Sequence, residues 1–410
     1  MEIRTFFCFL TVLAITGIEG LKNGHNDPNV TNWRTYVDGM DEFSSDLYNA
    51  VKNENLLKNV VVSPLSVNVL LNIFLSGADG NTKNQILEAL HLPTFNMNVK
   101  LSYSRLIKYL TASERVTTKI LNKLYVSNEF SIKEDFNTVL VNYFQSKVEN
   151  LDFKDSVKAA DTINSWISTE TNEKIKELFT PDTLSGSGIA AVNVLYFKGE
   201  WLNEMIMLNE LTGEPTSNRD FYTTNGNYQV PMMNIEEQFN YGVLPEFDAT
   251  FVEIPFKDVK YFMMIILPNQ VNGLATVERK LGETNLTSIR EKGSIRYVNI
   301  VMPEFKIESK IEMKNILQSM GLRDMFTTSS NLNGISNESM HVNDVVQKCF
   351  IAVNKFGVEA AAASGSSLVA HMLPSNIAKF NVNHPFYFKI VKNLAGKVGI
   401  TLFEGSVKSF

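Results

Sequence analysis

The sequence predicts a single α+β domain that runs from about residue 30 to residue 410. Helical spacing dominates its first half, strand-like runs dominate its second half, and neither repeats nor long low-complexity linkers divide them. Hydrophobic residues make up 44% of the chain and charged residues 20%, so the chain can bury a substantial core. The formal net charge of −6 gives no indication of nucleic acid as a partner.

The expected helices are segments with apolar residues three or four positions apart, or short apolar runs that begin after a helix-capping residue. Residues 35–52 show the amphipathic spacing, and residues 67–75 form a strongly apolar helix. Further helices are expected over residues 81–90, 133–144, 159–177 and 310–320, the last one ending at Gly321.

The expected strands are short apolar or alternating runs bounded by Gly, Pro, Asn or Ser. They cover residues 60–62, 120–126, 190–197, 262–267, 294–307 and 347–353. Residues 386–390 and 398–403 are expected to form a hairpin around residues 393–396. Continuous apolar runs such as 190–197 are typical of strands that are covered on both faces.

Residues 1–20 have the pattern of a secretory signal peptide. Glu2 and Arg4 precede an apolar run at 6–15, and the small residues Gly17 and Gly20 offer cleavage sites. Polar residues shorten the apolar run below the roughly 20 residues of a membrane anchor. We therefore expect a signal peptide at 1–20, no membrane span, and a single domain over residues 21–410.

Cysteine use and glycosylation patterns agree with a secreted protein. Cys8 belongs to the signal peptide, so Cys349 is the one cysteine that remains. Its apolar neighbours predict a buried, unreactive thiol. Sequons for N-glycosylation stand at Asn29, Asn285 and Asn337.

Catalytic and metal-binding motifs are missing from the sequence. There is no Gly-x-Ser-x-Gly, no His-Glu-x-x-His, no Cys-x-x-Cys, no phosphate loop and no dinucleotide fingerprint. The five histidines are scattered, so we expect neither an enzyme, nor a metal site, nor a cofactor, and His341 and His384 are assigned structural roles. Basic residues between 100 and 119 are spread out, which favours a solvated helix face over a glycosaminoglycan site.

A strip of small residues near the C-terminus, residues 357–367, reads Gly-Val-Glu-Ala-Ala-Ala-Ala-Ser-Gly-Ser-Ser. Helix propensity alone predicts a short surface helix at 359–363, and composition also permits a flexible linker. The slim side chains and the absence of Pro before Pro374 equally permit an exposed loop that later becomes a strand inside a sheet.

Several motifs in order along the chain resemble the serpin family of serine protease inhibitors. They are Val62-Ser63-Pro64-Leu65-Ser66, residues 77–82, the run Asn193-Val194-Leu195-Tyr196-Phe197-Lys198-Gly199-Glu200-Trp201, residues 230–233, 253–256, 266–268 and 302–305, Gly321-Leu322, and His384-Pro385-Phe386. The resemblance covers nearly all of the chain after residue 30. It implies a fold of three β-sheets and about nine helices, with an exposed reactive-centre loop at about residues 357–380.

The resemblance also assigns roles to individual residues. The hinge of the reactive loop would comprise Gly357, Val358, Glu359, Ala360, Ala361, Ala362, Ala363 and Ser364. In an inhibitory serpin a protease cuts the loop and is held as an acyl-enzyme while the loop inserts into the central sheet. Along such a strand Val358, Ala360, Ala362 and Ser364 would face one way, and Glu359, Ala361, Ala363 and Gly365 the other.

The residues that control opening of the central sheet, at positions called the shutter and the breach in serpins, would be Ser63, Ser66, Asn193, Trp201 and Gln347. The chain departs from the family pattern at three places. Gln347 replaces a usual His but can still hydrogen-bond Asn193, Val358 replaces a usual Thr, and Lys355 replaces an acidic residue before the hinge.

By resemblance to serpins, the loop length counted from Gly357 would put the cleaved bond at His371-Met372, with Met372-Leu373 as the alternative. These residues favour a chymotrypsin-like or elastase-like serine protease as the partner. We expect a secreted monomer that acts as a suicide inhibitor. The alternative is a non-inhibitory serpin that serves as a carrier, storage or binding protein, for which Lys355 and Phe356 are the best support.

Overall fold

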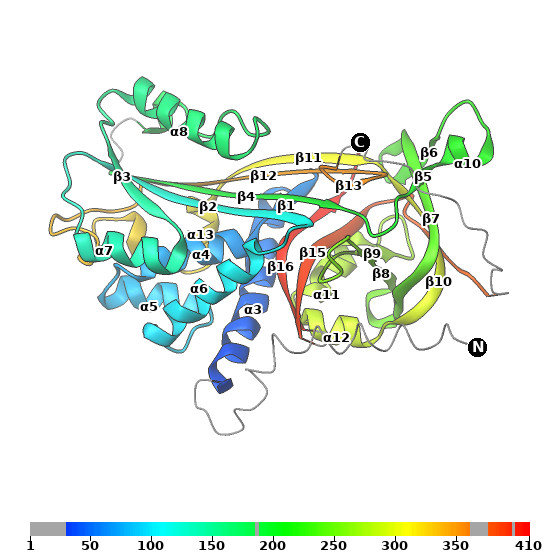
Figure 1. Ribbon diagram of the computed structural model, residues 1–410, viewed down its shortest axis with the longest axis horizontal. Helices are drawn as coiled ribbons and strands as arrows, with labels where there is room; N and C mark the ends of the chain where they lie inside the picture. The colour runs from blue at the N-terminus through cyan, green and yellow to red at the C-terminus, as the bar shows by residue number, and fades with distance from the viewer. Residues whose placement is uncertain (1–29, 185–187, 361–375, 396–397) are drawn as a thin grey trace.

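The computed structural model describes residues 30–184, 188–360, 376–395 and 398–410 (Figure 1). These residues contain eleven α-helical segments and two large sheets. The helices are α3 (Val30–Glu54), α4 (Pro64–Leu75), α5 (Gly80–Ala89), α6 (Met97–Thr111), α7 (Glu134–Val139), α8 (Ser156–Glu170), α9 (Pro181–Leu184), α10 (Leu208–Thr212), α11 (Leu274–Leu281), α12 (Leu286–Glu291) and α13 (Met313–Ser319).

One sheet has six strands and contains the start of the predicted reactive loop. In spatial order it comprises β11 (Phe305–Glu312), β12 (Asp344–Asn354), β13 (Gly357–Val358), β4 (Ile189–Glu200), β2 (Val116–Ser127) and β3 (Lys147–Leu151). Strands β12 and β4 run parallel and also pair directly with each other along part of their length.

The other sheet has ten strands. Its main path is β1 (Val60–Val62), β16 (Val398–Val407), β15 (Phe386–Ala395), β9 (Tyr261–Pro268), β8 (Ala249–Pro255), β7 (Gly226–Leu244), β10 (Ser294–Pro303) and β14 (Ala378–Asn381), and β5 (Ile206–Met207) and β6 (Asn218–Thr223) also pair with β7. Every residue of β9 is buried, as its continuous apolar run predicts.

The six-stranded sheet lies between two helical layers. In Figure 1, α8 lies over one face of this sheet, and α4, α5 and α6 lie on the opposite side. Apolar side chains of α8, including Ile163 and Ile167, pack in one buried cluster with Val192, Val194 and Phe350 of the sheet. Because alternate residues of these strands face opposite layers, both faces of the strands are apolar.

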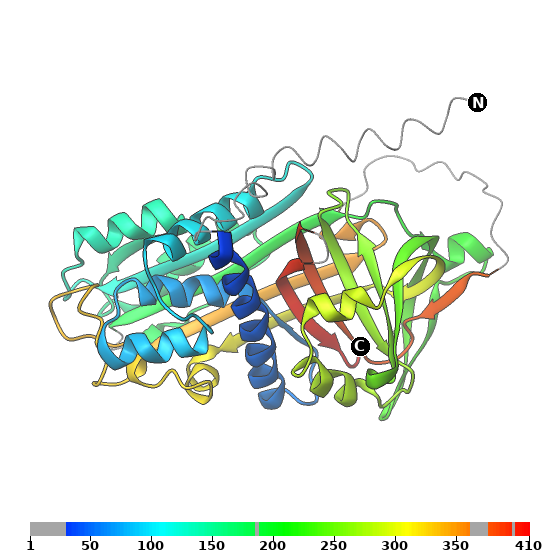
Figure 2. The same cartoon turned by 90° about the horizontal axis from the view of Figure 1, so that it is seen from below.

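Helix α3 links the two ends of the molecule. It lies between the helical end and the β-rich end in Figure 2 and contacts α4, β1, β16 and α13. Its buried face carries Phe43, Leu47 and Val51, which follow one another at the predicted helical spacing. The large core therefore continues from the helical end into the ten-stranded sheet.

Several expected boundaries were wrong, and pairing with neighbouring strands explains the first two. The strand expected at 294–307 is two strands, β10 and β11, separated at Glu304. Strand β11 pairs with β12 as far as Glu312, so the helix expected from residue 310 begins at Met313. The helix expected at 133–144 continues from α7 as a π-helical turn, Leu140–Phe144, and α8 ends at Glu170 rather than at residue 177.

The resemblance implied three sheets and about nine helices, and the structure refines both numbers for the described residues. Strand β7 has 19 residues and pairs in turn with β6, β5, β10 and β8. This single long strand makes two sheet regions continuous, which produces the ten-stranded sheet. The helix total of eleven includes short segments such as α9 and α10, of four and five residues.

Candidate functional site

The hinge begins inside the six-stranded sheet. Strands β12 and β4 pair directly from Asp344 to Cys349 of β12, and then diverge. The two residues of β13 fill the resulting gap, because Gly357 and Val358 pair with β12 on one side and with β4 on the other. The Val358 side chain is fully buried in the main core. The chain thus begins a new antiparallel strand between two parallel ones (Figure 1).

Gly357 allows the chain to enter this gap. Its φ of 147° is a conformation that side-chain-bearing residues rarely adopt. A Cβ at this position would lie 2.1 Å from the carbonyl oxygen of Gly199 and 2.7 Å from the Cα of Glu200. The close approach of β13 to β4 therefore requires glycine.

Side-chain and backbone hydrogen bonds fix the turn before the hinge. The Asn354 Oδ1 accepts from the backbone N–H groups of Phe356 and Gly357, at 2.9 and 3.2 Å. The Lys355 ammonium donates to both carboxylate oxygens of Glu210 on α10, at 2.7 and 3.0 Å. Sequence reasoning missed Asn354 and Glu210, although Asn at the end of a strand is a common turn signal.

Trp201 holds the same turn from the end of β4. Its indole Nε1 donates to the carbonyl of Asn354 at 2.9 Å, and its backbone N–H donates to the carbonyl of Phe356 at 2.9 Å. The ring is fully buried and stacks on Phe256, with 4.7 Å between centroids. Trp201 therefore lies where β4 and β12 have separated, beside the point at which the hinge enters.

A buried polar network joins β12 and β4 where they still pair. Gln347 and Asn193 are directly opposite in the register, and the Gln347 Nε2 donates to the Asn193 Oδ1 at 2.5 Å. The Gln347 Oε1 accepts from the backbone N–H of Ser63 at 3.0 Å, and its Nε2 also donates to the Ser63 carbonyl at 2.9 Å. All three residues are fully buried.

The network continues into β2 and α4. Asn122 is opposite Asn193 in the β2–β4 register, and its Oδ1 accepts from the Asn193 Nδ2 at 2.5 Å. The Asn193 Nδ2 also donates to the Ser66 hydroxyl at 2.8 Å, and Ser63 caps α4 by accepting from the backbone N–H of Ser66. Asn122 was not identified from the sequence. Its signal was a polar residue within the expected strand 120–126.

Comparison with known proteins identifies the family. The family model described as Serpin (serine protease inhibitor) matches residues 38–409. The chain belongs to the serpin family. The serpin Alaserpin of Manduca sexta is 33% identical over 376 residues, which cover 90% of this chain and 92% of the relative. Antichymotrypsin-2 of Bombyx mori is 31% identical over 372 residues and covers 90% of this chain and 96% of its own.

Solved serpin structures agree with this assignment. Serpin48 of the insect Tenebrio molitor, described as a highly specific serpin, matches with a TM-score of 0.81 and 30% identity, covering 94% of this chain and 100% of its own. Uncleaved ovalbumin matches with a TM-score of 0.78 at 22% identity, which shows the shared fold. The family and the serpin fold predicted from the sequence motifs are therefore confirmed.

Some predicted site residues of this serpin lie outside the described residues. They are Ala361, Ala362, Ala363 and Ser364 of the hinge, His371, Met372 and Leu373 at the expected cleavage site, Asn29, and the signal peptide. The described sequon residues Asn285 and Asn337 are both exposed. Asn285 also caps α12 through its Oδ1, which accepts from the backbone N–H of Ser288 at 2.8 Å.

The described residues include potential metal ligands and one cysteine. Within them, no three His, Cys, Asp or Glu side chains lie together as a metal site would require. Cys349 is fully buried, and burial raises the pKa of its thiol, which keeps it protonated. No helix in the described ranges is both long and apolar enough to span a membrane.

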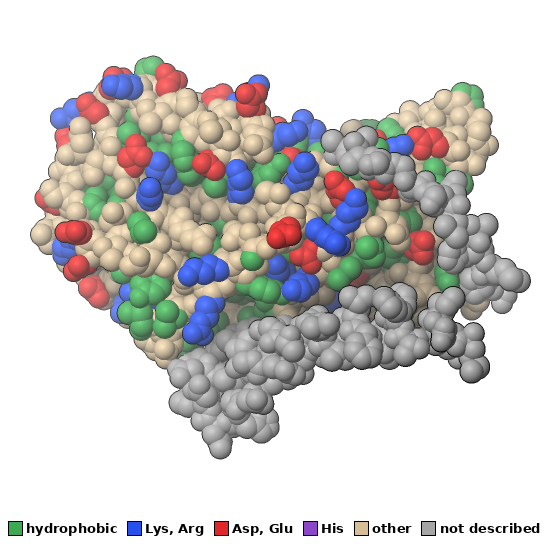
Figure 3. Space-filling model, viewed as in Figure 1, with side chains coloured by type: hydrophobic (Ala, Val, Ile, Leu, Met, Phe, Trp, Pro, Cys, Tyr) green, Lys and Arg blue, Asp and Glu red, His purple; other side chains and the backbone are tan. Residues whose placement is uncertain are grey.

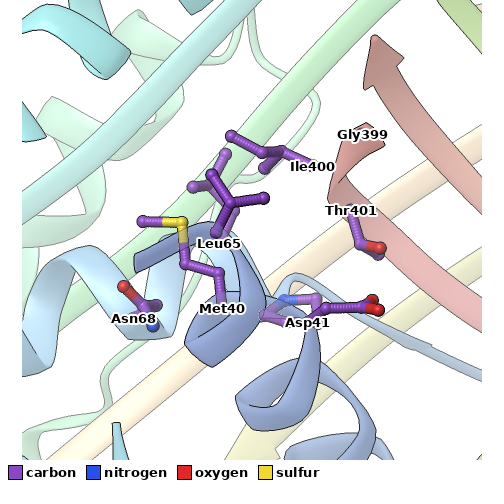
Figure 4. A pocket seen from close by; sticks show the side chains of 9 residues that line it. Met40, Asp41, Leu65, Asn68, Gly399, Ile400 and Thr401 are labelled. Atoms are coloured by element: carbon purple, nitrogen blue, oxygen red, sulfur yellow. The ribbon is translucent and has the colours of Figure 1, made fainter. Parts of the chain in front are cut away.

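A small cavity beside the shutter is closed to ligands. Figure 4 shows it between Met40 and Asp41 of α3, Leu65 and Asn68 of α4, and residues 399–401 of β16. Its volume of about 10 Å³ matches roughly one water molecule.

Proposed function

We propose that this serpin inhibits a serine protease as a suicide substrate. The single observation that carries the proposal is the position of β13, whose residues Gly357 and Val358 already pair with both β12 and β4. Full insertion after cleavage would extend this strand along the gap by separating β12 from β4. Each inserted residue adds ladder hydrogen bonds of about 1 kcal/mol.

The turn before the hinge supports this proposal. Lys355 was the best sequence argument for a non-inhibitory serpin, because it replaces an acidic residue. Its ammonium pairs with Glu210 and its carbonyl accepts from the backbone N–H of Met205 at 2.9 Å, so it is anchored outside the inserting segment. A fixed residue at this position provides an anchor and does not have to enter the sheet.

We further propose that cleavage occurs at His371-Met372, with Met372-Leu373 as the alternative, by a chymotrypsin-like or elastase-like protease. The name of the relative Antichymotrypsin-2 is consistent with a chymotrypsin-like protease. The name of another relative, Antitrypsin from Bombyx mori, which is 29% identical, points instead to a trypsin-like protease. Secretion through the signal peptide at 1–20, with glycans on Asn29, Asn285 and Asn337, belongs to the same proposal.

The test is incubation of the full chain with chymotrypsin-like, elastase-like and trypsin-like proteases, followed by denaturing electrophoresis and mass spectrometry. We expect a covalent complex that survives SDS and a C-terminal fragment beginning at Met372 or Leu373. Clean cleavage by every protease, with an unchanged melting temperature of the cut protein, would favour a carrier or storage role. Cutting confined to Lys or Arg would refute the proposed protease class.

Two hinge variants sharpen this experiment. Val358→Arg would put an unpaired charge at a fully buried position, which costs several kcal/mol and should block insertion. We therefore expect it to be cut without forming a complex. Val358→Thr keeps a β-branched, uncharged side chain and should retain the complex. Equal behaviour of the two variants would show that Val358 is not part of an inserting hinge.

A further inference from the structure

Glu359 has a strained backbone at the point where the chain leaves the sheet. Its φ is +52°, a left-handed conformation that non-glycine residues adopt at a cost of about 1 kcal/mol or more. It is held from both sides, since its backbone N–H donates to the carbonyl of Ala352 at 2.8 Å and the carbonyl of Ala360 accepts from the Asn354 Nδ2 at 3.0 Å. The strand conformation of β13 therefore ends abruptly at Glu359.

The carboxylate of Glu359 is buried without a hydrogen bond. Both oxygens are shielded from solvent, and neither has a hydrogen-bond partner among the described residues. The charged and titratable groups that face it are Lys174 after α8, Tyr196 and Lys198 on β4, and Lys306 on β11. The Tyr196 hydroxyl comes close enough to favour the ionised carboxylate, but none of these four groups meets the geometry of a full hydrogen bond with it.

Two of the lysine ammonium groups that face Glu359 also lie over an aromatic ring. The Nζ atoms of Lys306 and Lys174 lie 5.0 and 5.8 Å from the ring centroid of Phe350. On the face of the molecule viewed in Figure 3, Lys and Arg side chains are interspersed with Asp and Glu side chains. Positive charge therefore surrounds Glu359 at a distance, but no single ion pair compensates its desolvation.

We infer that the Glu359 carboxylate is a proton-dependent control on the hinge: when ionised it destabilises the two-residue insertion of Gly357 and Val358, and when protonated it stabilises that insertion. Either withdrawal of the hinge or its further extension frees Glu359 from the left-handed conformation. The inference rests on the proposed function of residues 357–364 as an inserting hinge. It adds a regulatory role for Glu359, which lies next to the buried anchor Val358.

The direction of the pH effect follows from the burial of the carboxylate. Desolvation raises the pKa of Glu359, while Lys174, the Tyr196 hydroxyl, Lys198 and Lys306 act in the opposite direction. A carboxyl group with a raised pKa binds its proton more tightly in the two-residue inserted state than in a hydrated hinge. Falling pH should therefore increase the population of the inserted hinge, by at most about tenfold per pH unit for one proton.

Hydrogen exchange of the peptide that spans residues 352–360 measures this population in the uncut protein without any protease. We expect its protection factor, corrected for the intrinsic pH dependence of exchange, to rise as the pH falls from about 7.5 to 5 in the wild type. In Glu359→Gln the protection should be high and independent of pH. Glu359→Ala provides a second uncharged variant if the amide does not fold.

The matched control is Glu308→Gln on the neighbouring strand β11, where the exposed carboxylate pairs with Lys348 at 2.8 Å. This variant should keep the wild-type pH dependence. A wild-type protection factor that is flat with pH, or an equal slope in Glu359→Gln, would overturn the inference. No protease is present in this experiment, so either hydrogen-exchange result leaves the test of protease inhibition unaffected. Conversely, failure to form a covalent complex with a protease would not change how the pH dependence of hydrogen exchange is interpreted.

Discussion

Replacement of Gln347 by Leu tests whether the buried polar network keeps β12 and β4 together. The change leaves the backbone N–H of Ser63 and the Oδ1 of Asn193 without their partner, whereas the Ser63 carbonyl still accepts from Val67. A buried polar group that loses its partner costs about 1–3 kcal/mol. Two such groups give an expected loss of roughly 2–6 kcal/mol in the uncut protein.

The loop-cleaved protein should lose less. If cleavage inserts a strand between β12 and β4, Gln347 and Asn193 no longer face each other, so their bond is already absent. About half of the loss, the part due to Ser63, should then remain after cleavage. The uncut variant should therefore lose more stability than the cut variant, and it should insert its loop spontaneously more often.

Urea unfolding of the uncut and cut forms, followed by far-UV circular dichroism, measures both losses. Gln238→Leu is the control, because Gln238 is an exposed residue of β7 and its replacement should change stability by less than about 0.5 kcal/mol. An equal loss in both forms would refute the argument that the Gln347–Asn193 bond opposes strand separation. A loss no greater than that of Gln238→Leu would show that Gln347 does not stabilise the uncut fold.

Three further outcomes follow from individual residues. Gly357→Val should expel β13 from the sheet, because its Cβ would clash with the backbone of β4, and hydrogen exchange of the hinge should lose its protection. Glu404→Leu removes the carboxylate that lies 3.2 Å from the buried Lys389 and accepts from the Ser44 and Tyr387 hydroxyls, so it should cost about 3–5 kcal/mol in urea unfolding, and Lys389→Met should restore part of that loss. Burial lowers the pKa of His384 in the folded protein. The stability that the neutral imidazole contributes should therefore be present above the unfolded pKa of about 6.5 and be lost as the pH falls below it. In thermal unfolding, His384→Asn should reduce the dependence of the melting temperature on pH in this range.

Linear motifs determined most of what could be predicted about the fold. The run from Asn193 to Trp201 contains both the buried strand β4 and two residues of the site, and its continuous apolar pattern is a local property of the sequence. Gly357 can adopt a positive φ because it has no Cβ, which is also a local property of the sequence. Such features depend on neighbouring residues and need no knowledge of strand register.

Features that depend on register could not be derived from local patterns, and the Gln347–Asn193 hydrogen bond was expected only from the family resemblance. Asn122, Asn193 and Gln347 form one row across β2, β4 and β12, although 71 and 154 positions separate Asn193 from its two partners. Lys389 and Glu404 are likewise opposite in the β15–β16 register. A charged or amide residue inside an apolar strand signals a buried polar contact, but pairing alone reveals its partner.

The positions of the hinge and the polar row explain how one sheet can be both stable and ready to open. At one end, β4 and β12 have separated, Trp201 donates across the gap to Asn354, and Gly357 and Val358 already form the first ladder contacts of a new strand. At the paired end, Gln347 and Asn193 join the same two strands by a buried hydrogen bond. Extension of the new strand gains about 1 kcal/mol per ladder bond but must first break that buried contact. The polar row would thus set the barrier to insertion, and the new ladder hydrogen bonds would set its driving force.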